Sequence, residues 1–136
     1  MITIAVLGLD QFVVGDYSRM NTKGIADILE TKEDNICFYA PSSFVFHNGV
    51  DQSSFHVIVK VTAPLKYQAF EKLLAEYIHE TLCKVVINMD IQFMYFDEKN
   101  EYHFANGDYP LFLNEDELLY DEDNEDDDDN DDDEED

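Results

Sequence analysis

The order of hydrophobic periods over the first 96 residues is the feature that most constrains the fold. Residues 2–8 are apolar on both faces, which is typical of a central strand. Residues 11–31 then carry apolar side chains at helical spacing, among them Phe12, Met20, Ile25 and Leu29. Residues 36–40 form a second apolar run that ends at Pro41. The first part of the chain therefore predicts a strand, a helix and a strand.

The same order returns after a predicted hairpin. Asn48-Gly49 separates two apolar runs and supplies the positive φ angles of a tight two-residue turn. Residues 55–62 alternate as a strand, and Pro64 can occupy the first position of the helix that follows. That helix has one apolar stripe, and residues 85–96 then alternate as a long strand. The stripe consists of Phe70, Leu73, Leu74, Tyr77, Ile78 and Leu82.

These elements predict one α+β domain. Two β-α-β units form one four-stranded sheet with two helices on one face. The element order leaves two topologies open: two parallel units side by side, or a ferredoxin-like split β-α-β. Both leave one sheet face uncovered, and a symmetric homo-oligomer is the simplest cover. Asn106-Gly107 further predicts a short C-terminal β extension over 109–113, which Pro110 would confine to a sheet edge.

Charge divides the chain at residue 114. The sequence has 32 acidic and 8 basic residues, for a formal net charge of -24. Of the acidic residues, 17 lie in the last 22 positions, which hold no base, so residues 1–114 carry about -7. Like charges repel and there is little to bury, so we expect a folded domain over 1–114 and a disordered acidic tail over 115–136.

The tail has two candidate roles: it aids solubility, or it contacts a basic protein partner. The apolar residues 118–120 within the tail form either the last ordered turn or a short anchor for that partner. An anionic chain with scattered bases disfavours binding to nucleic acid or to a membrane surface. The candidate partner-binding residues are Leu118, Leu119, Tyr120, Asp126, Asp127, Asp128, Asp129, Asp131, Asp132 and Asp133.

Several classes of chemistry have no support in the sequence. The four histidines lack partners at metal-ligand spacing, and no glycine-rich phosphate loop occurs, so we expect no metal and no cofactor. The opening residues do not resemble a signal peptide. Cys37 and Cys83 are therefore expected to be reduced thiols in a cytoplasmic protein.

Several segments of the chain, in their order and spacing, resemble those of a known family. In order they are the opening strand and helix, ADILETKEDNICFYAPSSFVFHNG, SFHVIVKV, FEKLLAEYIHETL, DIQFMYF and YHFANG. Together they resemble a small bacterial family of unknown function with the tautomerase fold, the fold of macrophage migration inhibitory factor and 4-oxalocrotonate tautomerase. The resemblance covers about residues 1–107. It implies two β-α-β units, a homotrimer with inward-facing sheets, and C-terminal strands that extend a neighbour's sheet.

The catalytic feature of that superfamily is absent here. Its base is a proline that follows the initiator methionine, and this sequence has Ile2 there, a bulky residue that favours retention of Met1. Arg19, the sole arginine, is a weak counterpart of the superfamily's substrate-binding arginines. We therefore expect an uncharacterised, non-catalytic interaction or accessory module. The alternative is a degenerate tautomerase that acts on a keto–enol substrate through the N-terminal amine, which requires a pocket around Met1 and a cation beside it.

Overall fold

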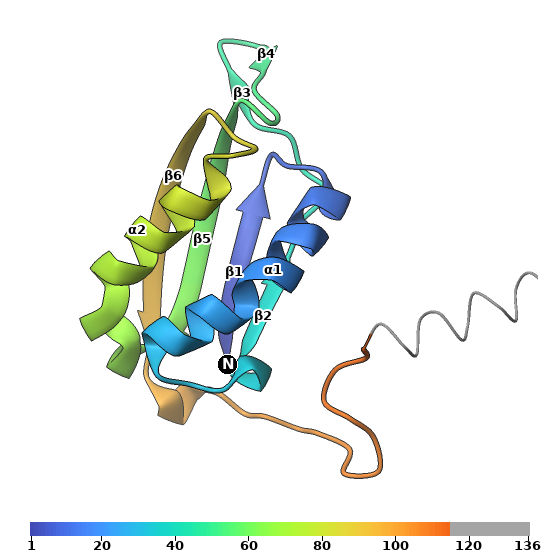
Figure 1. The fold of residues 1–136 in the computed structure, drawn as a ribbon, viewed down its shortest axis with the longest axis vertical. Coiled ribbons are helices and arrows are strands. Elements are labelled where there is room, and N and C mark those ends of the chain that lie inside the picture. The colour runs from blue at the N-terminus through green and yellow to red at the C-terminus, as the bar shows by residue number, and fades with distance from the viewer. Residues whose placement is uncertain (115–136) are drawn as a thin grey trace, which may run out of the picture. The chain divides into compact units, whose positions relative to one another are not determined.

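The computed structural model describes residues 1–114. It divides the chain into two units, the first over residues 1–102 and the second beginning at residue 103, and each is described by itself. All regular elements of the described residues lie in the first unit (Figure 1). In chain order they are β1 (Ile2–Leu7), α1 (Gln11–Leu29), η1 (Glu33–Asn35), β2 (Ile36–Tyr39), β3 (Phe46–His47), β4 (Val50–Asp51), β5 (His56–Pro64), η2 (Leu65–Phe70), α2 (Glu71–Leu82), β6 (Asn88–Phe96) and η3 (Glu98–Asn100), where η marks a 3₁₀ turn.

The four long strands form one mixed sheet in the order β2-β1-β5-β6. Strands β1 and β2 are parallel, β5 and β6 are parallel, and β1 pairs with β5 in the antiparallel direction. Ile2 lies opposite Ile36, so the two strands of the first β-α-β unit are direct neighbours. The predicted pair of β-α-β units is confirmed. The ferredoxin-like alternative is wrong, because that topology inserts another strand between the two strands of each unit.

Both helices cover the same face of the sheet (Figure 1). Alternation places every second side chain of each strand against them, including Ile4, Val59 and Phe93. The opposite face is uncovered in the single chain and is mixed in character, with Lys60, Gln92 and Met94 exposed. The fully buried side chains of the core are Ile2, Ile4, Val6, Ile25, Leu29, Val57, Val59, Val61, Leu74, Ile78, Leu82 and Val86.

Helix α1 is rotated relative to the predicted apolar stripe. Phe12 and Met20, expected in the core, are 76% and 75% exposed, whereas Tyr17 and Asn21 are buried. Hydropathy places Tyr and Asn outside, but here their polar atoms have partners inside: the Asn21 amide donates to the Tyr17 carbonyl, at 2.9 Å. The stripe of α2 is confirmed apart from Leu73, which is exposed.

The two helices approach each other closely at Gly24. A Cβ placed there would lie 2.8 Å from the Cζ atom of Tyr77, so the glycine leaves room for that ring. The Tyr77 hydroxyl donates to the Asn21 side-chain oxygen, at 2.9 Å. The Tyr17 and Thr81 hydroxyls share a second hydrogen bond of 2.6 Å. Burial raises the pKa of Tyr17 to about 12, although the bond to Thr81 lowers it in part. A pair of tyrosines therefore joins α1 to α2.

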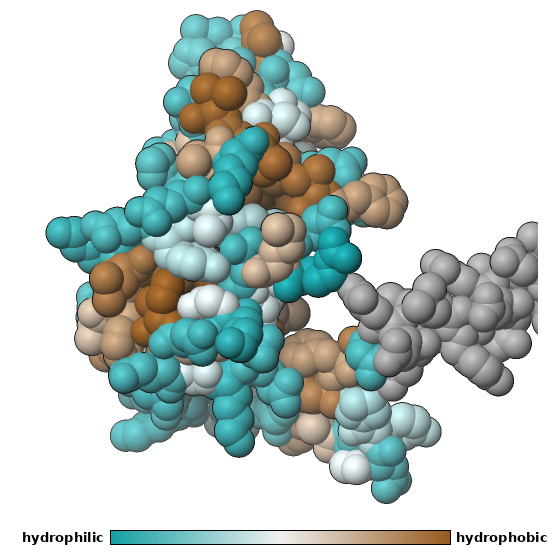
Figure 2. Space-filling model, in the orientation of Figure 1, coloured by the Kyte–Doolittle hydropathy of each residue, from teal (hydrophilic) through white to brown (hydrophobic). Residues whose placement is uncertain are grey.

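The predicted hairpin is present. Asn48 and Gly49 have φ angles of 48° and 80° and connect β3 to β4. Figure 2 shows apolar surface gathered near this end of the first unit, where Phe44, Phe46 and Val50 are exposed. Two boundaries differ from expectation. Pro64 ends β5 instead of opening a helix, and β6 begins at Asn88 because residues 83–87 form a turn that buries Val86.

The described part of the second unit, residues 103–114, contains turns and bends and no strand. The expected C-terminal β extension is therefore absent there. Asn106 opens a turn instead: its carbonyl accepts from the Tyr109 amide at 3.2 Å, and its side chain accepts from the Asp108 amide at 2.9 Å. The expected tail, with Leu118, Tyr120 and the aspartates from Asp126 onward, lies outside the described residues. Within residues 1–114, no helix is long and apolar enough to cross a membrane.

Candidate functional site

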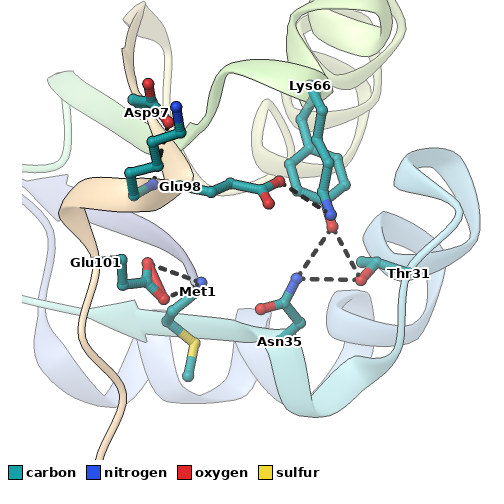
Figure 3. Close-up of polar contacts among 9 residues, drawn as sticks. Met1, Thr31, Asn35, Lys66, Asp97, Glu98 and Glu101 are labelled. Atoms are coloured by element: carbon teal, nitrogen blue, oxygen red, sulfur yellow. Dashed lines mark hydrogen bonds and ion pairs between the residues drawn. The ribbon is translucent and has the colours of Figure 1, made fainter.

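The sheet topology gathers polar side chains around the start of β1. The antiparallel register between β1 and β5 brings Met1 close to the ends of β5 and β6, and the parallel register with β2 brings it close to Asn35. Each of these three strand ends adjoins a 3₁₀ turn: η1 precedes β2, η2 follows β5, and η3 follows β6. The N-terminus therefore lies among three short turns (Figure 3).

The turn η3 holds the carboxylate that binds the N-terminus. Asp97 begins the turn, and its side chain accepts from the Lys99 amide at 3.0 Å. Glu98 is the first residue of the turn, and Glu101 caps its C-terminal end. The Met1 ammonium donates to both carboxylate oxygens of Glu101, at 2.6 and 3.0 Å (Figure 3). The side chains of Met1 and Glu101 are 22% and 28% exposed, so this is a partly buried ion pair.

A second ion pair lies beside the first. Lys66, in η2, places its Nζ atom 3.1 Å from Glu98 Oε1 (Figure 3). The hydrogen bond to Glu98 and, to a smaller extent, the electrostatic interaction with Tyr67 raise the pKa of Lys66 above its ordinary value. The side chains of both Lys66 and Glu98 are more than half exposed. Solvent screening makes such a pair a small contribution to stability.

Neutral polar groups complete the wall. Asn35 Nδ2 donates to the Tyr67 hydroxyl and to Thr31 Oγ1, both at 3.1 Å. The Tyr67 hydroxyl in turn donates to Thr31 Oγ1 at 3.3 Å. This triangle fixes η2 to η1 and to the end of α1 (Figure 3). The groups surround a cavity of about 250 Å³. Its lining residues are Met1, Asn35, Pro64, Lys66, Tyr67, Phe96, Glu98 and Glu101.

The charges of this cavity decide what chemistry it allows. Two cations, the Met1 ammonium and Lys66, face two carboxylates, Glu98 and Glu101. An amine serves as a proton acceptor through its lone pair, and an ammonium group has none. In the described geometry the N-terminal nitrogen is a donor to Glu101. The cavity therefore has the amine and the adjacent cation that tautomerase chemistry requires, but pairs the amine with the Glu101 carboxylate.

Of the residues singled out from the sequence, some line the cavity and others do not. Met1 lines the cavity, whereas Ile2 is fully buried in the core. Arg19 lies on α1, where it binds Asp16 at 2.6 Å, and is not among the lining residues. The tail residues lie outside the described part of the chain.

Sequence reasoning missed Lys66, Glu98 and Glu101. Each lies two to five residues after a predicted strand, 55–62 or 85–96, a position that by itself does not distinguish it from other charged residues.

A larger cavity, of about 380 Å³, lies at the other end of β1. Gly8, Pro41 and four serines are among its lining residues, and Asp10 is the single charged one. The Asp10 carboxylate is engaged as the N-cap of α1, where it accepts from the Phe12 amide at 2.8 Å. Since this cavity presents no cation and no base, we take the smaller cavity at Met1 as the functional candidate. Within residues 1–114, no group of three metal-ligating side chains is present.

Comparison with known proteins identifies the fold. No protein-family model and no curated protein matches the sequence. Solved structures do match. A domain of unknown function (DUF1904) from Sebaldella termitidis superposes with a TM-score of 0.68 at 20% identity, over 76% of this chain and 95% of that one.

A macrophage migration inhibitory factor-like protein from Entamoeba histolytica superposes with a TM-score of 0.59 at 9% identity, over 76% of this chain and 93% of that one. The fold is the tautomerase fold.

A fused 4-OT wild-type asymmetric trimer also superposes on the chain, with a TM-score of 0.58 at 13% identity, over 80% of this chain and 95% of that one. At these identities, the similarity to tautomerase-fold proteins shows the architecture alone.

Proposed function

We propose that this chain is a non-catalytic tautomerase-fold protein that acts as an interaction or accessory module. One observation carries the proposal: the Met1 nitrogen donates to both oxygens of Glu101, so a carboxylate of the protein occupies the position beside this nitrogen. The sequence supports the same conclusion, because Ile2 stands where the superfamily has its proline. The site of the base is thus occupied by an ion pair.

The second candidate is a degenerate tautomerase that uses the Met1 amine as its base. The cavity of about 250 Å³ beside that amine, with Lys66 in its wall, favours this candidate. A carboxylate substrate could compete with Glu101 and release the nitrogen. The two candidates differ in whether the nitrogen ever loses its proton.

Keto–enol interconversion of phenylpyruvate by the purified full chain distinguishes the two. We expect the rate to equal that of buffer, because the ammonium group cannot accept a proton from carbon. Intact-mass measurement tests whether Met1 is retained. A rate above buffer that disappears when the N-terminal amine is acetylated would favour the degenerate enzyme.

We propose further that the protein is a homotrimer whose sheets face inward. The uncovered sheet face supports this assembly, because it places Met94 and Lys60 together without a covering layer. The similarity to a trimer described as fused 4-OT points the same way. β6 is an edge strand of the sheet, and its nine residues are available for pairing with a strand of another chain.

We propose that residues 115–136 form a separate acidic tail on a domain of residues 1–114, and that the protein is cytoplasmic. The charge of the tail favours solubility, contact with a basic protein partner, or both. Deletion of 115–136 tests this role. We expect unchanged unfolding of the domain and loss of salt-sensitive binding to a poly-lysine probe. Equal binding by the full and shortened chains would contradict the partner role.

A further inference from the structure

The charge balance of the Met1 cavity bears on which ligand it accepts. Its wall holds two positive groups, the Met1 ammonium and Lys66, and two negative ones, Glu98 and Glu101. The groups are arranged as two ion pairs, with N···O distances of 2.6 and 3.1 Å. The formal charge of these four groups is zero.

A ligand with one charge fits this wall poorly. A carboxylate that binds Met1 or Lys66 displaces Glu101 or Glu98 and leaves that carboxylate without its cation. An amine that binds a glutamate leaves Lys66 or Met1 without its anion. An unpaired charge at Met1 or Glu101, which are partly buried, carries a desolvation penalty, whereas Lys66 and Glu98 are more than half exposed and incur a smaller one. Each singly charged ligand therefore forms one ion pair at the expense of another.

A ligand with both charges avoids this penalty. Its carboxylate can take the place of a glutamate beside a cation, and its ammonium can take the place of that cation beside the glutamate. Every charged group then retains a charge-assisted hydrogen bond. Asn35 and Tyr67 add neutral polar groups to the same wall.

The size of the cavity limits the ligand. A volume of about 250 Å³ holds roughly eight water molecules at about 30 Å³ each. That space suits a compact metabolite and is below the range of drug-sized ligands. The exposed side chains of Lys66 and Glu98 leave the cavity accessible from solvent.

We infer that this cavity binds a small zwitterion, a free amino acid with a short side chain. The inference deepens the proposed function and rests on it, since it takes the Met1 cavity as a binding site. The ligand is recognised by charge exchange with the two ion pairs.

Titration of the full-length protein with four matched probes tests the inference. Alanine carries both charges, propionate and pyruvate carry the negative one, and ethylamine carries the positive one. We expect alanine to shift the amide NMR signals around Lys66, Glu98 and Glu101 with about tenfold tighter binding than any other probe, which corresponds to about 1.4 kcal/mol.

Two variants should shift the ligand preference away from alanine, one toward anions and the other toward cations. Glu101→Gln makes the four-group wall net positive, so propionate and pyruvate should gain about tenfold relative to alanine. Lys66→Gln makes it net negative, so ethylamine should gain by a similar factor. Glu76→Gln and Lys72→Gln are the matched controls. They alter an exposed ion pair on α2 that does not line the cavity, and should leave the ranking unchanged.

The inference is overturned if pyruvate binds the wild type as tightly as alanine, or if alanine produces no shift in the millimolar range. If Glu101→Gln fails to fold, the Lys66→Gln variant and the relative affinities of the four probes for the wild type test the inference. The phenylpyruvate assay keeps the two proposals apart. Enolisation with alanine binding intact would refute the non-catalytic function alone, and absence of both would refute the zwitterion site alone.

Discussion

Gly24 shows how a single residue sets the distance between two helices. Within a helix, replacing glycine by alanine usually stabilises a protein by about 0.5–1 kcal/mol, because glycine loses more backbone freedom on folding. At Gly24 the new methyl group would press on the Tyr77 ring, whose hydroxyl is already bound to Asn21. Steric contact therefore outweighs propensity at this position.

We expect Gly24→Ala to lower the free energy of unfolding by about 1–3 kcal/mol, the usual cost of overpacking. Gly15→Ala is the matched control, since it lies in the same helix with no atom within 4 Å of its added carbon. It should raise stability. Urea unfolding of both variants measures the difference, and an increase in both would show that α1 and α2 separate without cost.

Residue-scale reasoning also marks the limit of sequence prediction at the site. Met1 was identified because the superfamily resemblance draws attention to the N-terminus. Glu101 was not, because it lies 100 residues away and meets Met1 only through the strand register. No local pattern distinguishes Glu98 and Glu101 from other surface carboxylates. The η3 turn follows β6, so its position can be predicted only when the end of β6 is known.

At the scale of elements, the contact between α1 and α2 makes stability depend on pH. The folded pKa of Tyr17, about 12, lies above its ordinary value of 10.0. The folded state therefore favours the neutral phenol. This contribution is fully present below pH 10 and is lost as the pH rises through about 12. Burial and the Glu71 carboxylate raise the pKa of Tyr95 as well, so it acts in the same direction.

We expect the free energy of unfolding to fall between pH 10 and pH 12, by up to about 1.4 kcal/mol per pH unit for each titrating tyrosine. Tyr17→Phe should flatten this fall, while costing about 1 kcal/mol at neutral pH through loss of the bond to Thr81. Tyr39→Phe, on an exposed side chain, is the control. An unchanged slope in Tyr17→Phe would refute the role of this contact.

The elements themselves were well predicted from the sequence. Alternation over 55–62 and the Asn48-Gly49 turn identify β5 and the β3–β4 hairpin, because both signals are local. The face of α1 was less well predicted. Its two glycines carry no side chain to mark a face, and Tyr17 and Asn21 are buried through hydrogen bonds that hydropathy does not record.

At the scale of the whole molecule, the open sheet face determines how copies assemble. Met94 lies on β6 opposite Thr62, on the side away from the helices, and is 63% exposed. A large apolar side chain on an uncovered sheet face is typical of an interface. In the proposed trimer, a charge at this position would be removed from water, which carries a desolvation penalty.

We expect the wild type to sediment at about three times the chain mass of 15.8 kDa. Met94→Asp should shift the mass toward that of one chain. Met20→Asp is the matched control, because this methionine is also exposed, at 75%, but lies on α1, on the other side of the sheet. Analytical ultracentrifugation gives both masses. A monomeric wild type, or equal masses for the two variants, would contradict the assembly.

The antiparallel pairing of β1 with β5 relates the two β-α-β units by an approximate two-fold rotation. The start of β5 is thus the internal counterpart of the start of β1. Phe55 precedes β5 as Met1 precedes β1, and its backbone nitrogen is an uncharged amide that donates to the Gln52 carbonyl, at 2.9 Å. The two halves of this duplicated architecture are therefore chemically unequal: the nitrogen before β5 belongs to a neutral peptide group, whereas its counterpart before β1 is held by the Glu101 carboxylate.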